Sequence, residues 1–303
     1  MSILLDENTR VLVQAITGTQ GRMDVQRMLR YGTKVVAGVT PGKGGQEVDG
    51  IPVYDSCAEA VRHHQIDAAI SYVPPRALKA SSLDLIEAGV PLLAISAERI
   101  PIHDLAVILG EARKAGVRVV GPNTLGIVSP GKALIGGIGG ERPDRALLRG
   151  PVGIMSKSGG MGAEICWTLT RAGIGQSTYV SVGGEAMSGT AFPELLELFE
   201  RDPETRAVIL FGETGTLYEE EAARLIRSGA ITKPVFAIIV GRFTEALPGV
   251  RFGHGGTIIE GGAGTPSAKI RALEDAGVTV LRRLSELPVH IAATLGMPLS
   301  KAS

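Results

Sequence analysis

The segment "RFGHGGTIIEGGAGT", residues 251–265, surrounds a single histidine, His254, with glycines. Glycines on both sides leave the imidazole ring approachable and the neighbouring backbone N–H groups free. A neutral imidazole is a competent nucleophile toward a phosphoryl group. The segment therefore indicates either a histidine that carries phosphate or a flexible surface turn. The other four histidines are expected to be surface or capping residues: His63, His64, His103 and His290.

A carboxylate that orients this ring is expected at Glu213. This residue ends the apolar run "RAVILFGE" (206–213), which is typical of a buried strand. The carboxyl ends of strands in an α/β sheet face the usual ligand crevice. A carboxylate on one ring nitrogen would fix the tautomer of His254 and raise its basicity. Glu213 is therefore the predicted partner of His254.

A cradle for an anion is expected in "SKSGGMGAE" (156–164). An apolar strand ends here at Met155, and a serine and two glycines open a helix. Backbone N–H groups and the helix dipole favour an anion at such a place. The predicted phosphate-binding residues are Ser158, Gly159 and Gly160. Together with His254 and Glu213, they favour phosphoryl transfer through histidine.

A second glycine turn, "TGTQG" (17–21), follows the first expected strand and precedes a helix. Such a turn brings backbone N–H groups to a phosphate at a helix N-terminus. The spacing is not the full dinucleotide pattern, so a turn that only packs helix on strand is the alternative.

Lys43 stands where a NAD-binding domain usually offers an acid to the ribose diol, in "VAGVTPGKGGQE". A lysine at this place suits a ribose that carries a phosphate, as in NADP or coenzyme A. The alternative is an ordinary solvated loop lysine.

Apolar runs alternate with amphipathic stretches along the whole chain, which predicts parallel sheets with helices on both faces. The pattern occurs twice, so the fold class is α/β with two doubly wound parallel-sheet domains. Residues 121–150 are rich in Gly and Pro and lack clean periodicity. The predicted division is a first domain at 1–130, a connection at 131–150 and a second domain at 151–303.

Composition excludes several classes of protein. The 303 residues carry 31 basic and 31 acidic side chains, so no electrostatic footprint for nucleic acid or an anionic membrane is expected. Two distant cysteines give neither a disulfide framework nor a zinc spacing, and no metal site is expected. Without a signal peptide or a long apolar run, the chain is expected in the cytoplasm, or in the mitochondrial matrix after processing.

Seven motifs, matched in order, resemble the alpha subunit of succinyl-CoA synthetase and related nucleotide-dependent acid–CoA ligases over essentially the full length. They are "LVQAITGTQG", "GVTPGKGG", "GPNTLGIVSPGK", "SKSGGMGAE", "VGGEAMSGTAF", "FGETG" and "GHGGTII". The resemblance implies a Rossmann-like CoA-binding domain, then a flavodoxin-like ligase domain, in an enzyme of the tricarboxylic acid cycle.

The resemblance also implies roles for particular residues. His254 would be the phosphohistidine and Glu213 the carboxylate that positions it. Coenzyme A would be held by residues of the first domain: Thr17, Gly18, Thr19, Gln20, Lys43, Ser96, Ala97 and Glu98. ATP or GTP, with Mg, would bind the ATP-grasp domain of a separate beta subunit, in an alpha–beta pair or a dimer of such pairs. The phosphoryl group would pass from the histidine to the acid, and CoA sulfur would then attack the acyl phosphate.

Two departures from the succinate enzymes concern the acid. Where they typically read "SGTLTYE", this chain reads "SGGMGAE", which puts Ala163 in place of a tyrosine beside the substrate. Together with Phe252, this resembles ATP-citrate lyase and citryl-CoA synthetase and suggests a wider pocket. Citryl-CoA or malyl-CoA synthesis is thus an alternative to succinyl-CoA synthesis. The second departure is "FGETGT", where Thr214 and Thr216 replace apolar and glycine positions.

Two rival functions remain from other classes. One is a CoA-binding regulatory protein without catalysis, which the retained His254 and Glu213 disfavour. The other is a NADP-dependent oxidoreductase, which no further motif supports.

Overall fold

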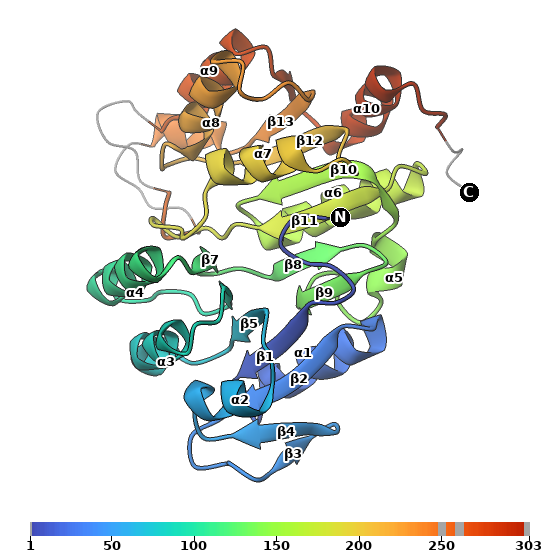
Figure 1. The fold of residues 1–303 in the computed structure, drawn as a ribbon. Coiled ribbons are helices and arrows are strands. Elements are labelled where there is room, and N and C mark those ends of the chain that lie inside the picture. The colour runs from blue at the N-terminus through green and yellow to red at the C-terminus, as the bar shows by residue number, and fades with distance from the viewer. Residues whose placement is uncertain (1, 248–252, 258–263, 300–303) are drawn as a thin grey trace.

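The computed structural model describes residues 2–247, 253–257 and 264–299. Two seven-stranded sheets form its framework, each lined with helices on both faces (Figure 1). The predicted fold class, α/β with two doubly wound and mainly parallel sheets, is confirmed. The elements of the first sheet and its helices are β1 (Arg10–Gln14), α1 (Thr19–Tyr31), β2 (Lys34–Val39), β3 (Glu47–Val48), β4 (Ile51–Tyr54), α2 (Cys57–His63), β5 (Ala68–Ser71), α3 (Pro75–Glu87), β6 (Leu92–Ile95), α4 (Ile102–Ala115) and β7 (Arg118–Val120).

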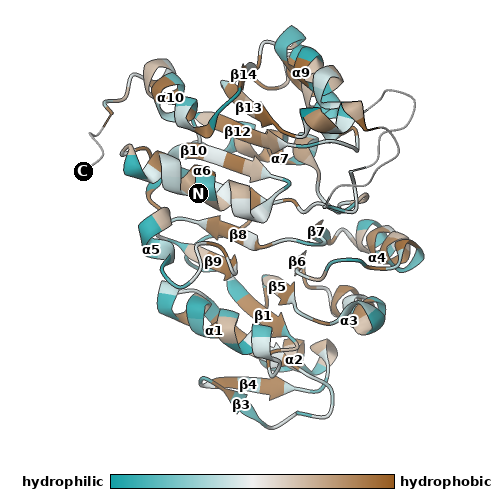
Figure 2. Ribbon diagram, turned by 180° about the vertical axis from the view of Figure 1, so that it is seen from behind, coloured by the Kyte–Doolittle hydropathy of each residue, from teal (hydrophilic) through white to brown (hydrophobic). Residues whose placement is uncertain are grey.

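The first sheet has the strand order β3-β4-β2-β1-β5-β6-β7, and only the β3–β4 pair is antiparallel among the pairs described. Side chains alternate across it as the period of a strand requires. On β1, Val11 and Val13 pack toward α1, whereas Leu12 packs toward α2, α3 and α4. Figure 2 shows the result: hydrophobic strands lie inside, and the hydrophilic faces of the helices point outward.

The second sheet has the order β14-β13-β12-β10-β11-β8-β9, so its three central strands are parallel neighbours. Helices α6 and α10 pack together on one face, and α7, α8 and α9 cover the other. The elements are β8 (Gly126–Ser129), β9 (Ala133–Gly136), α5 (Pro143–Ala146), β10 (Arg149–Ser156), α6 (Gly159–Arg171), β11 (Gln176–Ser181), α7 (Phe192–Arg201), β12 (Ala207–Gly212), α8 (Tyr218–Arg227), β13 (Val235–Ile239), η1 (Arg242–Ala246), α9 (Pro266–Asp275), β14 (Thr279–Leu281), η2 (Leu284–Glu286) and α10 (Leu287–Leu295).

The glycine-rich stretch 121–150 is more ordered than its sequence suggests. It holds the antiparallel hairpin β8–β9, which joins the second sheet through β11. Gly126 and Gly136 face each other in this hairpin with positive φ, and a Cβ on Gly126 would lie 1.8 Å from a backbone oxygen of β9. Thr33, after α1, donates to the carbonyl of Leu134 on β9 at 2.8 Å. The hairpin, which belongs to the second sheet, therefore packs against the first domain.

Candidate active site

The ring of His254 lies against the carboxylate of Glu213. Its Nδ1 is 2.8 and 2.9 Å from the two carboxylate oxygens, so an Nδ1–H donates to Glu213. About a third of the histidine side chain is exposed and the glutamate is nearly buried. The hydrogen bond to Glu213 raises the pKa of His254 above 6.5, against the opposing effect of burial. In the neutral ring, the lone pair is then left on Nε2, which is the nucleophilic nitrogen.

Gly184, just after β11, makes room for this ring. A Cβ on Gly184 would lie 2.2 Å from Cγ of His254. The loop is also seated here, because the N–H of Gly256 donates to the carbonyl of Gly184 at 3.0 Å. Thr257 closes the turn with a bond from its hydroxyl to the carbonyl of His254 at 2.8 Å. Phe252, which the sequence also singled out, lies outside the described residues.

The predicted anion cradle follows β10 at the same edge of the sheet. Ser158 is the N-cap of α6, and its hydroxyl accepts from the N–H of Met161 at 3.4 Å. Gly159 and Gly160 form the first turn of that helix. Because β12, β10 and β11 are adjacent parallel strands, Glu213, Ser158 and Gly184 all lie at their carboxyl ends.

Lys157, between β10 and Ser158, is fully buried. Its Nζ donates to the hydroxyl of Thr216 at 2.6 Å and lies 5.3 Å above the ring of Tyr218. Burial lowers the pKa of this lysine. Thr214 forms another such link, 2.9 Å from the hydroxyl of Thr244 on η1. Thr214 and Thr216, which depart from the family's usual residues, thus form hydrogen bonds with other residues of the second domain.

Space around the α6 N-terminus is uneven. A Cβ on Gly160 would meet nothing within 4 Å, whereas one on Gly159 would lie 2.4 Å from Leu125. Ala163, one turn along α6, is half-buried. On the far side of α6, the hydroxyl of the buried Tyr179 donates to the carbonyl of Gly159 at 2.8 Å. The open side of this helix start is therefore the side of Gly160.

The predicted CoA residues of the first domain lie at the carboxyl ends of its strands. Thr17 and Gly18 follow β1, and Thr19 and Gln20 begin α1, whose N-cap Gly18 has no side-chain cap hydrogen bond. Thr17 is half-buried and the other three are exposed. A Cβ on Gly21 would lie 2.4 Å from the carbonyl oxygen of Ala15, which explains the last glycine of this turn.

Lys43 is exposed in the loop between β2 and β3, and its backbone N–H donates to Asp55 at 3.0 Å. Ser96, Ala97 and Glu98 directly follow β6. Strands β2, β1, β5 and β6 are consecutive parallel neighbours, so both segments lie at the same edge as the turn after β1.

A mainly apolar cavity of about 480 Å³ opens at the carboxyl ends of β1 and β2, and sequence reasoning did not identify it. It is bounded by the ends of β1 and β2, by α3 and by the acids Asp55 and Asp84. Its wall comes from small residues, which give no signal in a sequence: Ala15, Ala77, Ala80 and Ser81 among others.

Glu185 joins the two predicted sites and was also missed. Its Oε1 accepts from the backbone N–H of Arg99 at 2.9 Å. A Cβ on Gly255 would lie 2.4 Å from its Oε2, so the same carboxylate lies against the loop of His254. The N–H of Asn123 donates to the carbonyl of Ala97 at 2.8 Å, which ties the same segment to the turn that leads into β8 of the second sheet.

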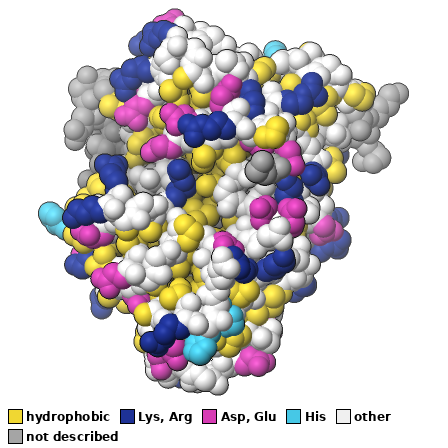
Figure 3. All heavy atoms as spheres, in the orientation of Figure 1, with side chains coloured by type: hydrophobic (Ala, Val, Ile, Leu, Met, Phe, Trp, Pro, Cys, Tyr) yellow, Lys and Arg dark blue, Asp and Glu magenta, His cyan; other side chains and the backbone are white. Residues whose placement is uncertain are grey.

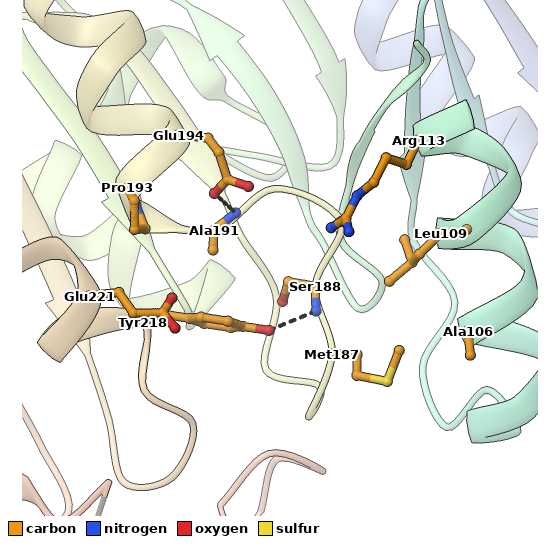
Figure 4. Close-up of a pocket in the computed structure, with 12 residues that line it drawn as sticks. Ala106, Leu109, Arg113, Met187, Ser188, Ala191, Pro193, Glu194, Tyr218 and Glu221 are labelled. Carbon is orange, nitrogen blue, oxygen red and sulfur yellow. Dashed lines mark hydrogen bonds between the residues drawn. The ribbon is translucent and has the colours of Figure 1, made fainter. Parts of the chain in front are cut away.

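A groove of about 520 Å³ lies beside this junction, between α4 and the loop that follows β11 (Figure 4). Arg113 and Leu109 reach into it from α4, and Tyr218 faces them from α8. The hydroxyl of Tyr218 accepts from the N–H of Ser188 at 3.0 Å. Since Lys157 lies over the same ring, Tyr218 separates this groove from the interior of the second domain.

Positive and negative side chains are interspersed over the face in Figure 3. Within the described ranges, no group of three His, Cys, Asp or Glu side chains is placed to hold a metal ion. Among the same residues, no helix is both long and apolar enough to cross a membrane.

The two domains match two known families. Residues 6–99 match the CoA binding domain, and residues 149–295 match the succinyl-CoA ligase like flavodoxin domain. The fold, the glycine turns and the histidine–carboxylate pair agree with these two matches. The chain is therefore a two-domain subunit of the acid–CoA ligase class.

Full-length relatives make the assignment narrower. The chain is 46% identical to succinate–CoA ligase [ADP-forming] subunit alpha 1 of Archaeoglobus fulgidus, over 97% of this chain and 99% of the relative. It is 47% identical to the alpha subunit of the same enzyme of Methanothermobacter thermautotrophicus, over 97% and 98%. The chain belongs to the succinate–CoA ligase alpha-subunit family.

Other relatives differ in the acid. An ADP-forming sulfoacetate-CoA ligase subunit of Bilophila wadsworthia is 42% identical over 98% of this chain and 100% of the relative. Among solved structures, ATP citrate lyase of Methanosaeta concilii, in complex with (3S)-citryl-CoA, superposes with a TM-score of 0.89 at 26% identity. That match covers 97% of this chain but only 52% of the lyase chain, so this chain spans about half of it.

Proposed function

We propose that the chain is the alpha subunit of an ADP-forming acid–CoA ligase that works through a phosphohistidine at His254. The observation that carries the proposal is the bond between Nδ1 of His254 and Glu213, which leaves Nε2 as the nucleophile. A strand-end carboxylate on a histidine that is about one third exposed serves no evident packing purpose. It suits a ring that must attack phosphorus and then release it.

In the proposed reaction, Nε2 of His254 attacks the γ-phosphorus of the nucleotide and ADP leaves. A carboxylate oxygen of the acid then attacks the phosphorus and the N–P bond breaks. Glu213 stabilises the imidazolium character of the phosphorylated ring. The N–H groups of Gly159 and Gly160, with the hydroxyl of Ser158, would receive the phosphoryl oxygens at a helix N-terminus.

We propose that coenzyme A binds the carboxyl edge of the first sheet. Its phosphates would lie against the turn from Thr17 to Gln20 and meet the backbone N–H groups of Thr19 and Gln20, since the N–H of Gly18 donates to the carbonyl of Ala15 at 3.0 Å. Its ribose phosphate would meet Lys43, and the segment Ser96–Glu98 would guide the rest of the molecule. The 480 Å³ cavity has apolar walls and an acidic rim, which suit the flat adenine ring and its amino group.

The nucleotide would come from a beta subunit with an ATP-grasp domain. The names of the relatives favour ATP over GTP, since they are ADP-forming enzymes. The relatives come from archaea and bacteria, in keeping with a cytoplasmic enzyme of the tricarboxylic acid cycle or of a related acid–CoA pathway.

A second candidate concerns only the acid. The open space at Gly160 and the small Ala163 favour an acid bulkier than succinate, such as malate or citrate. The sulfoacetate and citrate proteins among the relatives agree that acids vary on this framework.

The test starts from the chain purified with its beta partner. Incubation with γ-labelled ATP is expected to give an acid-labile, base-stable label on the alpha chain. Succinate, malate or citrate, each with CoA, would then discharge it. Label that persists in His254→Asn would contradict the phosphohistidine.

A further inference from the structure

We propose that the ion pair between Glu219 and Lys269 is a positioning device for the reaction, which holds the backbone of Glu213 so that its carboxylate faces His254. The inference rests on the proposed function and adds two residues that do not touch the ring. Nζ of Lys269 on α9 lies 2.5 Å from Oε2 of Glu219 on α8. Both side chains are fully buried.

The pair binds Glu213 from both sides of its backbone. The N–H of Glu213 donates to Oε1 of Glu219 at 3.1 Å. Lys269 donates to the carbonyl of Glu213 at 2.7 Å and to that of Gly215 at 2.5 Å. An ammonium has three protons, and here they have three acceptors. Among the described residues, the hydrogen bonds of the Lys269 ammonium therefore go to Glu219 or to the turn that carries Glu213.

Local sequence is arranged for this contact. A Cβ on Gly212 would lie 2.4 Å from Oε1 of Glu219, so glycine lets the carboxylate approach the strand. The turn that follows takes positive φ at Gly215 and at Thr216, the latter an unfavourable conformation for a β-branched residue. Such a conformation persists only where neighbouring groups hold it.

The same pair also reaches the other end of the histidine loop. Lys269 lies in the first turns of α9, which begins directly after that loop. The N–H of Gly215 donates to the carbonyl of Gly264 at 2.8 Å. The ammonium group of Lys269 thus holds the turn of Glu213, and Lys269 itself lies on α9, the helix that follows the histidine loop.

Burying two charges is a poor way to stabilise a fold, because desolvation offsets most of their attraction and apolar side chains would serve as well. A role in positioning accounts for the pair. The double variant Glu219→Gln/Lys269→Met tests it. It removes both charges at similar volume and keeps an acceptor for the N–H of Glu213, but it leaves the carbonyls of Glu213 and Gly215 without their donor.

One readout is the pH dependence of the reaction of His254 with diethyl pyrocarbonate in the full chain, followed by mass spectrometry. Among the residues that the structure describes, the charged groups that face His254 are Glu213, Lys157 and Glu185. The variant leaves the side chains of Lys157 and Glu185 in place, but Lys157 donates to Thr216 in the same turn and its charge is coupled to Glu219 and Lys269. A shift therefore reports the turn as a whole, in which Glu213 has the largest effect on His254. We expect the midpoint to fall by about 1 pH unit. We also expect labelling from ATP in the complex with beta to slow about 10- to 100-fold.

Lys233→Met is the matched control, because Lys233 also donates to two carbonyls, of Phe199 and Asp202 at 2.6 Å each, away from His254. It is expected to keep the wild-type midpoint. A double variant with lower thermal stability but an unchanged midpoint and labelling rate would overturn the proposal.

If the double variant does not fold, the single variant Lys269→Arg tests the positioning role instead. It keeps the charge, but its planar fork does not match the three acceptors, so a lowered midpoint is expected and a wild-type midpoint contradicts the inference. A wild-type chain that takes no label, in which the variants still shift the midpoint, would instead refute the proposed function.

Discussion

The carboxylate of Glu185 accepts a hydrogen bond from the backbone N–H of Arg99 at 2.9 Å while its other oxygen lies against Gly255. One side chain thus connects the segment proposed for coenzyme A with the loop of His254. Arg99 has a positive φ of 56°, a conformation that such a bond helps to hold.

Glu185→Ala is therefore expected to impair the step in which both sites act. The discharge of phosphorylated enzyme by acid and CoA should slow about 10- to 150-fold, since a lost hydrogen bond to a charged group costs roughly 1.5–3 kcal/mol. Labelling of His254 from ATP should change less. Rapid-quench measurement of the two half-reactions separates them. Glu111→Ala, on the surface of α4, is the control, and equal slowing of both half-reactions would contradict the link.

Gly184→Ala should displace the ring of His254, because its Cβ would lie 2.2 Å from Cγ of the histidine. A displacement of about 1 Å is expected to reduce the labelling rate about 100-fold. The chain should fold as before, because the loop rather than the sheet can move aside.

Gly110→Ala is the matched control for this variant. Gly110 lies within α4 and a Cβ there would meet nothing within 4 Å. Alanine should leave labelling unchanged and stabilise the helix by roughly 1 kcal/mol. Equal labelling by the two variants would show that Gly184 does not seat the ring.

Much of the framework was predictable because buried parallel strands and amphipathic helices leave strong periodic patterns. The hairpin β8–β9 was not, since its strands are four residues long and its glycines, Gly126 and Gly136, resemble a linker. At the site, the pairing of His254 with Glu213 followed from a strand end and a glycine loop.

Contacts between elements that are far apart in the sequence leave no periodic pattern in it. Gly184 and Glu185 lie in an ordinary turn until His254, 70 residues later, is placed over them. Lys269 looks like a helix-surface lysine, as its place between Ala268 and Ile270 gives no sign that three acceptors surround it. Such residues are found only when the sheet order is known.

The rate of His254 labelling should rise with pH with a midpoint above 6.5, because the bond to Glu213 raises the pKa of the nucleophilic ring. Glu213→Gln removes the charge and should lower that midpoint, together with a large fall in rate. Single-turnover labelling between pH 5.5 and 8.5, within about two units of the ordinary histidine pKa, measures both. A midpoint that Glu213→Gln leaves in place would contradict the pairing.

The same shift makes a prediction about stability. The protonated ring is favoured in the folded state, so its contribution is fully present below pH 6.5 and is lost as pH rises through the raised folded pKa. Wild type should therefore lose thermal stability relative to His254→Asn as pH rises from 6 to about 8. Parallel melting curves for the two proteins would reveal a falling wild-type advantage; a difference that grows with pH would reverse the sign and exclude this pairing.

The choice of acid should depend on the open side of the α6 N-terminus. A side chain at Gly160 has free space, and Ala163 lies one turn further along the same helix. Gly160→Thr and Ala163→Tyr together should narrow the pocket and favour succinate over citrate by about 10- to 200-fold in kcat/KM, the range expected when an apolar pocket gains or loses a small group. Labelling by ATP should change less than acid selectivity, since the backbone N–H of residue 160 is kept in the proposed phosphate cradle. Gly159→Ala is an informative contrast, because its Cβ would lie 2.4 Å from Leu125 and should disturb packing instead of selectivity.

If wild type discharges its phosphoryl group only to succinate, and the double variant leaves that preference unchanged, then the space at Gly160 does not receive the acid and the wider pocket is not used for substrate.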